Sequence, residues 1–285
     1  MNPELNRQEI IDYYDHCQVD YELVWHLNTK MCMHYGYWDN DTANLREALV
    51  NMNKRVAVYA QVQQGDYVLD AGCGVGGSSI FLAKTFNCIT KGITLSEKQV
   101  ATCRDNAAKH GVSNQCSFEV QSYLATDFPD NTFDVVWGIE SVCYAYDKAD
   151  FLREAFRILK PGGRVIVADF FSSGVNEGTI ESELMDKWTS TWAIKAYADE
   201  DEFWNKMNVT GFIACKKHDA TSHVIKSIKR LYYSFFPGLP VTYISQALGM
   251  RNKIQTANTW STYYQYKAFK KGLWKYLFYS AKKPL

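Results

Sequence analysis

The chain has 285 residues, which suits one large α/β domain or such a domain carrying a smaller insertion. Its 31 Lys and Arg residues balance 31 Asp and Glu residues, so it lacks the basic surplus that a nucleic-acid binder sets against phosphates. Aromatic residues make up 15% of the chain, which suits either a pocket for an apolar ligand or simply an aromatic core.

The eight cysteines are scattered, without a C-x-x-C pair or a His/Cys cluster with zinc spacing. No stretch approaches the ~20 apolar residues that cross a bilayer, and the first residues lack a secretory signal pattern. Free thiols without a signal peptide indicate a reducing compartment. We therefore expect a cytoplasmic protein with no membrane span and no metal site. The sequence leaves a homo-oligomer open.

Periodicity predicts two helices and then alternating strands and helices. The first helices cover residues 7–27 and 45–62. Strands are predicted at residues 67–70, 88–93, 116–120, 133–139 and 164–170, with helices at 78–86, 96–110 and 148–160. Strands that alternate with helices at short spacing imply a parallel sheet with right-handed crossovers. The expected fold class is α/β, a Rossmann-like, doubly wound, mostly parallel sheet with helical lid insertions over its carboxyl edge.

The last third of the chain follows a different pattern. Residues 172–207 predict one or two Trp-rich helices, residues 211–221 and 274–281 predict strands, and residues 222–271 contain the expected loop FFPGLP. We expect three parts, namely N-terminal helices with an entrance motif (1–64), a Rossmann-like core (65–171), and lid helices interleaved with sheet-completing strands (172–285). Ligands of open α/β sheets bind beyond the strand carboxyl ends, which such a lid would cover.

The strongest local signal is VLDAGCGVGGSS, residues 68–79, where a strand ends at Asp70 and four glycines crowd the following turn. Glycines let the backbone approach a ligand, and the start of the next helix offers free amides. A carboxylate just before the glycines would repel a dinucleotide pyrophosphate. It suits a ligand with an ammonium or sulfonium group, which argues against an NAD(P)-dependent oxidoreductase.

This segment resembles motif I of class I S-adenosylmethionine-dependent methyltransferases. FPDNTFDVVWGIES (128–141) resembles their fourth-strand motif, and ILKPGGRVIVADF (158–170) their fifth-strand motif. MHYGYWD (33–39), GITLSEKQV (92–100) and IESVCYAYDK (139–148) resemble the small-molecule and lipid branch. That branch includes sterol, tocopherol and prenyl-diphosphate methyltransferases and cyclopropane fatty-acid synthases.

The resemblance implies methyl transfer from S-adenosyl-L-methionine to a small, lipophilic acceptor such as an isoprenoid, a sterol-like molecule or another natural product. The alternatives are a cyclopropane-forming or lipid-modifying enzyme that uses the same cofactor, or a non-catalytic subunit that only binds it. The balanced charge argues against a nucleic-acid partner.

The resemblance also implies which residues bind the cofactor. Most relatives end the second strand with an acidic residue, whereas here Thr94 and Gln99 would share the ribose hydroxyls, unless Thr94 only caps the next helix. Ser122 stands where many relatives carry Asp against the adenine amine, and Tyr123 could cover the ring. The expected cofactor-binding set is Tyr35, Asp70, Gly72, Gly74, Thr94, Leu95, Gln99, Ser122, Tyr123 and Ile139.

Glu140 and Tyr144 are the expected catalytic residues, because both follow the fourth strand at the edge where the methyl group must lie. Glu140 could stabilise a carbocation or act as a base, or it could only order the loop. An aromatic lid is expected from Tyr35, Trp38, Trp188, Trp192, Tyr232, Phe235 and Phe236. The acidic run at residues 199–202 suits a helix start better than a metal site.

Overall fold

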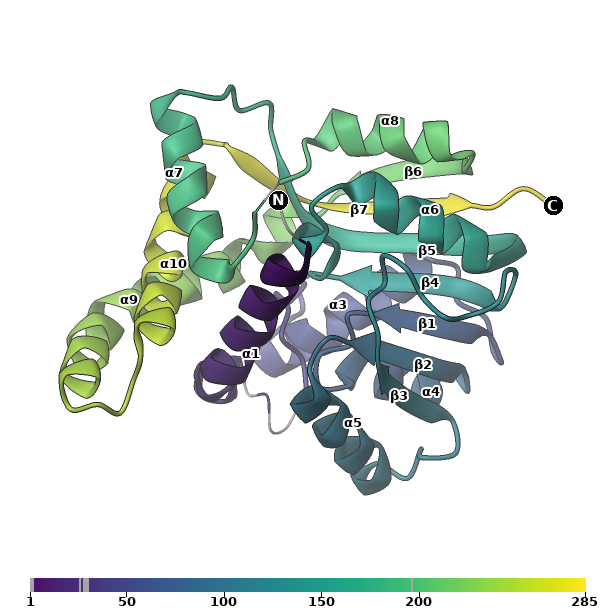
Figure 1. Cartoon of the computed structure of the whole chain (residues 1–285), viewed down its shortest axis with the longest axis horizontal. Helices are drawn as coiled ribbons and strands as arrows, with labels where there is room; N and C mark the ends of the chain where they lie inside the picture. The colour runs from purple at the N-terminus through teal and green to yellow at the C-terminus, as the bar shows by residue number, and fades with distance from the viewer. Residues whose placement is uncertain (1–2, 26, 28–30, 196) are drawn as a thin grey trace.

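A seven-stranded sheet forms the centre of the protein in the computed structural model, which describes residues 3–25, 27, 31–195 and 197–285 (Figure 1). The strand order is β3-β2-β1-β4-β5-β7-β6. The strands are β1 Tyr67–Ala71, β2 Ile89–Thr94, β3 Cys116–Val120, β4 Phe133–Ile139, β5 Leu159–Ser172, β6 Ile213–Asp219 and β7 Trp274–Lys282. β1 to β5 are parallel, and β7 runs antiparallel between β5 and β6. The predicted doubly wound, mostly parallel sheet is confirmed.

Helices cover both faces and the carboxyl edge of this sheet (Figure 1). They are α1 Pro3–Trp25, α3 Leu45–Tyr59, α4 Gly77–Phe86, α5 Glu97–Lys109, α6 Lys148–Ile158, α7 Ile180–Thr189, α8 Glu200–Thr210, α9 Thr221–Ala247 and α10 Lys253–Lys270, with short 3₁₀ turns at Val142–Tyr144 and Ser190–Trp192. The predicted strands and helices are present within a few residues. α6 ends two residues earlier than predicted, because Leu159 and Lys160 already belong to β5.

Alternate residues of the central strands face two separate apolar cores, because side chains of a strand point to opposite faces in turn. Val135 and Trp137 of β4 pack in the same core as Leu49 of α3. Val136 packs on the other face with Phe151 of α6. The sheet is therefore buried on both sides, and its carboxyl edge is left to accept a ligand.

The N-terminal helix α1 lies across the carboxyl edge of the parallel strands (Figure 1). Polar contacts fix it on two sides. On one side Ser96 Oγ, at the N-terminus of α5, donates to Asp15 Oδ1 at 2.8 Å. On the other side Arg251 donates two hydrogen bonds to the carboxylate of Asp20 at 2.7 and 2.8 Å. The predicted helix extended to residue 27, and residue 26 lies outside the described part of the chain.

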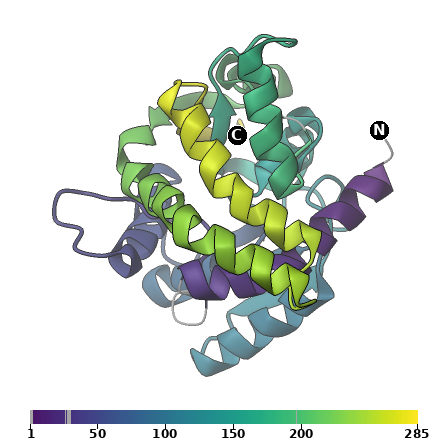
Figure 2. The ribbon, with the colours of Figure 1, turned by 90° about the vertical axis from the view of Figure 1, so that its left-hand side faces the viewer.

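The prediction of a loop at FFPGLP is wrong, because these residues lie inside α9 (Figure 2). Pro237 and Pro240 each remove a backbone donor and disfavour the helix by roughly 3 kcal/mol. Aromatic packing on α10 holds the helix in place around them. The Tyr232 ring stacks on Tyr266 at 4.1 Å, and Phe235 lies 5.1 Å from Trp260.

Within the described residues, no helix combines the length and the apolarity that spanning a membrane requires.

Candidate functional site

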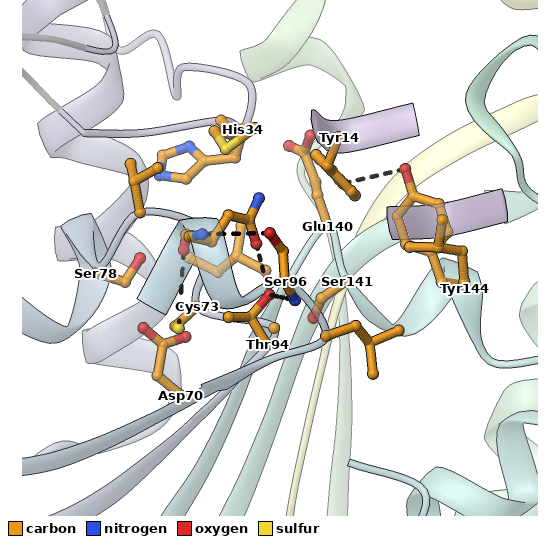
Figure 3. A pocket seen from close by; sticks show the side chains of 18 of the residues that line it. Tyr14, His34, Asp70, Cys73, Ser78, Thr94, Ser96, Glu140, Ser141 and Tyr144 are labelled. Carbon is orange, nitrogen blue, oxygen red and sulfur yellow. Dashed lines mark hydrogen bonds between the residues drawn. The ribbon is translucent and has the colours of Figure 1, made fainter. Parts of the chain in front are cut away.

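A cavity of about 910 Å³ lies at the carboxyl edge, where the strand order reverses between β1 and β4 (Figure 3). The loops after β1, β2 and β4 form its walls, together with α1. Ten of the predicted site residues line it, namely Asp70, Gly72, Gly74, Thr94, Leu95, Gln99, Tyr123, Ile139, Glu140 and Tyr144. Segments that are far apart in the sequence thus meet where the sheet topology places a ligand.

The glycine turn after β1 is shaped by close backbone packing. Gly72 and Gly74 have φ angles of +88° and +52°, which side chains disfavour. A Cβ atom on Gly72 would lie 2.4 Å from the Cβ of Ser141, which follows β4. Ser141 itself donates to the carbonyl of Ala71 at 2.6 Å. Gly72 therefore allows the ends of β1 and β4 to approach, and Gly74 lines the cavity opposite them.

Asp70 places a buried carboxyl group at this turn. Its Oδ2 accepts a hydrogen bond from Ser79 Oγ at 2.7 Å. Burial raises the pKa of Asp70 to about 6, while the hydrogen bonds from Ser79 oppose that shift. The group is thus largely ionised at neutral pH and favours a cationic part of a ligand.

Thr94 and Gln99 bond to each other across the end of β2. Thr94 Oγ1 donates to Gln99 Oε1 at 2.5 Å, and both side chains are buried. The cap of α5 is Ser96, whose Oγ accepts from the Gln99 amide at 3.2 Å. Thr94 contributes only a long contact of 3.4 Å to the Ser96 amide. Ser96 is therefore the residue that caps α5, whereas Thr94 and Gln99 form a separate polar pair in the cavity wall.

Glu140 has a left-handed backbone conformation, with a φ of +49°. Its Oε1 accepts from the Tyr35 amide at 2.7 Å and from the Tyr276 hydroxyl at 2.8 Å. Burial raises the pKa of Glu140 well above its usual value, while these two hydrogen bonds oppose the shift. A left-handed non-glycine residue costs of order 1–3 kcal/mol, and such strain concentrates at functional sites.

The predicted catalytic residue Tyr144 is joined to α1. The hydroxyl of Tyr14 donates to that of Tyr144 at 3.1 Å (Figure 3). Ile10, Ile11 and Tyr14 of α1 line the cavity beside it. The sequence predicted the apolar face of this helix but not its position over the site, because periodicity does not say which surface a face covers.

A second missed residue is Asn53 of α3, which links the entrance segment to the glycine turn. His34 Nδ1 bonds to the Tyr35 carbonyl at 2.8 Å, so its other nitrogen, 3.2 Å from Asn53 Nδ2, accepts from that amide. Asn53 Oδ1 in turn accepts from Ser78 Oγ at 2.7 Å. Burial lowers the pKa of His34 to about 4, so this histidine is neutral and satisfied by its neighbours at neutral pH.

Tyr35 and Ser122 are not brought into the main cavity. The Tyr35 side chain packs 5.3 Å from Phe170 and lines a smaller cavity on the far side of Glu140. The hydroxyl of Ser122 accepts from the Leu124 amide at 3.3 Å, and the neighbouring Gln121 lines the main cavity.

Most of the expected lid aromatics serve as internal packing. Trp188 is fully buried, 4.8 Å from Trp274. Trp38 donates to Ser227, and Tyr232 stacks on α10. Of the expected lid, Tyr35 and Trp192 line the smaller cavity. The role of the others in covering a ligand is not supported by these contacts.

The acidic run at residues 199–202 starts α8. Asp199 is the N-cap and accepts from the amides of Asp201 and Glu202. No three His, Cys, Asp or Glu side chains of the described residues are arranged to hold a metal ion.

Comparison with known proteins identifies the core. Residues 69–167 match the family model described as "Methyltransferase domain". This part of the chain is a methyltransferase domain. The matched residues run from β1 into β5 and include the glycine turn and Glu140.

Curated relatives share this domain. The chain is 39% identical over 138 residues to 27-O-demethylrifamycin SV methyltransferase of Amycolatopsis mediterranei, covering 48% of this chain and 51% of that protein. It is 31% identical over 219 residues to the chloroplastic tocopherol O-methyltransferase of Arabidopsis thaliana, covering 71% and 62%. The chain thus spans about half to three fifths of the length of these relatives.

Solved structures share the whole fold at low sequence identity. The [4+2]-cyclase SpnF superimposes with a TM-score of 0.80 at 22% identity, covering 98% of this chain and 96% of that chain. The geranyl diphosphate C-methyltransferase of Streptomyces coelicolor A3(2) gives 0.76 at 17% identity, covering 99% and 98%. The late helices and strands therefore belong to an architecture that occurs in other proteins.

Proposed function

We propose that this protein transfers a methyl group from S-adenosyl-L-methionine to a small, lipophilic acceptor. One observation carries the proposal. The main cavity adjoins a second, aromatic cavity, and the two share Tyr14, Met33, Glu140 and Tyr144 as a common wall. A cofactor and an acceptor in these two spaces would meet beside Glu140.

The residues of the main cavity fit the cofactor. The buried carboxylate of Asp70 suits a positively charged group, and no described side chain caps the N-terminus of α4 beside it. Thr94 and Gln99 offer a hydroxyl and an amide that suit ribose hydroxyls. Tyr123, which donates to the Ser141 carbonyl at 2.7 Å, offers a fixed aromatic ring for the adenine. When bound, S-adenosyl-L-methionine supplies an electrophilic methyl group on a sulfonium centre.

The second cavity suits an apolar acceptor. Glu140 is the one acidic or basic residue among the described residues that line it. The other lining residues are apolar or aromatic and include Tyr21, Tyr35, Phe170, Trp192 and Ile194. Such a lining supports an isoprenoid, a sterol-like molecule or another natural product. The lipophilic acceptors named for two relatives, tocopherol and geranyl diphosphate, agree with this choice.

Glu140 is the residue that we assign to proton or cation handling. The Tyr35 amide and the Tyr276 hydroxyl hold its Oε1, which fixes the carboxyl group in the shared wall. Because burial raises its pKa, Glu140 holds a proton more tightly than an exposed glutamate. In its ionised form it is therefore a stronger base toward an acceptor hydroxyl than an exposed glutamate, and its negative charge can stabilise a carbocation. The Tyr14–Tyr144 pair closes the wall beside it and excludes water.

Three further assignments belong to the proposal. We place the protein in the cytoplasm, as its buried free thiols suggest. We divide the chain at residues 64 and 171 into entrance, cofactor-binding and lid parts. Tyr35 contributes to the acceptor side through its ring, and Ser122 supports the adenine side through the turn that it stabilises.

Incubation with methyl-labelled S-adenosyl-L-methionine and a panel of terpenoids, sterols, fatty acids and phenols tests the proposal. We expect label in at least one terpenoid or phenol, and saturable binding of the cofactor but not of NAD(H) by calorimetry. Label in a cyclopropane ring of a fatty acid would show that the enzyme forms cyclopropane rings and does not methylate its acceptor. Tight cofactor binding with no label in any acceptor class would contradict the proposed activity.

A further inference from the structure

Basic residues are concentrated at the end of the chain. Residues 220–285 contain eleven Lys and Arg residues and no Asp or Glu, although the whole chain is neutral. α9, α10 and β7 occupy this region. The hairpin of α9 and α10 projects from the carboxyl edge of the sheet, at the left of Figure 1 and toward the viewer in Figure 2.

The outer face of α9 is basic in its first half and apolar in its second half. Residues three or four positions apart share one side of a helix. On this helix the exposed residues at such spacing are Lys226, Lys229, Arg230, Tyr233, Phe236, Val241, Ile244 and Leu248. Met250 and Lys253 continue the exposed surface into the turn before α10. We call these ten residues the hairpin face.

The apolar part of the hairpin face is an unusual concentration for this protein. Of the fifteen exposed large hydrophobic residues in the described part of the chain, seven lie between residues 233 and 250. Ile244 is 61% exposed, and Leu248 and Met250 are each 66% exposed. A cluster of this kind marks an interaction surface, whereas single exposed apolar residues are ordinary.

Packing on the inner side of the hairpin fixes the orientation of this face. The rings of Tyr232 and Phe235 lie against Tyr266 and Tyr263 of α10, at 4.1 and 5.1 Å. Leu231 and Phe235 are buried, while Tyr233 and Phe236 between and beside them are exposed. The hairpin face therefore points outward because the helix has a separate, occupied inner face.

Neighbouring elements leave the hairpin basic. Among the described contacts, acidic residues from two other elements form ion pairs with it, Asp20 of α1 with Arg251 and Glu181 of α7 with Lys271. Arg251 and Lys271 do not belong to the hairpin face. The Lys226 ammonium lies 5.0 Å from the Trp38 ring centroid and is exposed. The face thus combines exposed cations with exposed apolar side chains.

We propose that the hairpin face docks onto an anionic lipid bilayer. Amphipathic helices with a basic region beside aromatic and aliphatic side chains bind in the plane of a membrane interface, attracted by acidic headgroups. The apolar end of α9 would enter the interface while Lys226, Lys229 and Lys253 contact phosphates. A second copy of this chain fits less well, because a two-fold contact through this face would bring the same cations together.

A further cavity connects the hairpin with the acceptor cavity. The role of this connection rests on the proposed function. This third cavity of about 360 Å³ lies between α1, α9 and α10 and is lined by Leu231 and Ser234 of α9. It shares Tyr21 and Trp192 with the acceptor cavity. A lipophilic acceptor dissolved in the bilayer would thus reach Glu140 by way of the hairpin.

Vesicle flotation of the full chain tests the docking. We expect co-flotation with vesicles of phosphatidylcholine and phosphatidylglycerol and little with phosphatidylcholine alone, and a loss of binding as salt screens the charges. Lys229→Gln should lower the partition coefficient about fivefold, the worth of one cation near such a surface. The double substitution Ile244→Glu and Leu248→Glu should lower it tenfold or more.

Matched controls separate docking from folding and from catalysis. Val58→Glu and Val209→Glu alter equally exposed apolar residues on α3 and α8 and should leave flotation unchanged. Melting temperature and cofactor affinity should be the same in all variants. Wild-type flotation by the α9 variants, or a dimer that these substitutions convert to a monomer without any vesicle binding, would overturn the docking. Methylation of a detergent-dissolved acceptor tests the proposed function separately.

Discussion

At the scale of single residues, Glu140 combines a strained backbone with a fully engaged carboxyl oxygen. Its φ of +49° turns the chain after β4, and the Tyr35 amide and the Tyr276 hydroxyl bind the same Oε1. These contacts give Glu140 a structural role in joining the entrance segment to β7. They also hold it where the two cavities meet, which a catalytic role requires.

Glu140→Gln separates the two roles. The amide oxygen of Gln can accept both hydrogen bonds, so the local structure should persist while the side chain can no longer ionise. If the carboxylate acts as a base or stabilises a cation, kcat should fall by roughly 10²–10⁴-fold in steady-state assays. Cofactor affinity, measured by calorimetry, should change by no more than a few-fold.

Glu140→Ala is the matched comparison, because it also removes both hydrogen bonds. It should lower the melting temperature, which Glu140→Gln should leave nearly unchanged. Loss of cofactor binding in Glu140→Gln, with unchanged turnover of the bound complex, would assign Glu140 to the cofactor instead.

Sequence reasoning found the site residues that follow strands and missed those brought by helices. Asp70 and Thr94 lie at the carboxyl ends of strands, and the motifs that contain them have a fixed order along the chain. Tyr14 and Asn53 reach the cavity or its wall from α1 and α3, and no local pattern marks them. Their contribution depends on a tertiary contact that the sequence does not state.

At the scale of elements, the turn between β1 and α4 sets the shape of the cofactor cavity. Gly74 lines the cavity with a φ of +52°, and a Cβ atom there would meet Met33 Sδ at 3.3 Å. Gly74→Val should therefore strain the backbone and place a branched side chain at the cavity wall. We expect it to abolish measurable cofactor binding in calorimetry.

Gly174→Val controls for the strain alone. Gly174 has a φ of +68°, but nothing lies within 4 Å of the Cβ position, and it does not line the cavity. It should lower the melting temperature by a similar amount and keep the affinity for the cofactor. Equal affinity in both variants would show that the turn is not a cofactor contact.

The elements also show where local pattern fails. FFPGLP predicted a loop because Pro and Gly disfavour helices, yet the rings of Tyr232 and Phe235 pack on α10 and keep α9 continuous. The strands were predicted almost completely, since short buried apolar runs between turn residues are a strong signal. Tertiary packing overrides propensity most easily where aromatic side chains concentrate.

At the scale of the whole molecule, the fold is compatible with more than one activity. A [4+2]-cyclase and a geranyl diphosphate C-methyltransferase superimpose on nearly the whole chain. A shared fold therefore leaves the chemistry open, and the proposed activity rests on the residues of the two cavities. Those residues include buried carboxyl groups. Burial of an ionised carboxylate lowers the free energy of unfolding of the entire protein.

Two buried carboxyl groups, Asp70 of the main cavity and Asp169 of β5, predict how stability depends on pH. Burial raises the pKa of both Asp70 and Asp169 to about 6, from an ordinary value of 3.8. The folded state binds these protons more tightly than the unfolded state. Their contribution is therefore complete below about pH 4 and is lost as the pH rises through 6, about 3 kcal/mol for each group.

Asp70→Asn should isolate the contribution that the cofactor site makes to this pH dependence of stability. Without ligand, the variant should melt roughly 5 °C above the wild type at pH 7.5 and at nearly the same temperature at about pH 3.5, measured by calorimetry. Asp134→Asn should do the opposite, because hydrogen bonds from Lys160 and the Tyr67 amide overcome burial and lower the pKa of Asp134. A cationic ligand should reverse the order at pH 7.5, stabilising the wild type but not Asp70→Asn. A variant Asp70→Asn that is less stable than the wild type at pH 7.5 without ligand would contradict this prediction. It would show that burial of the ionised carboxylate does not destabilise the free protein.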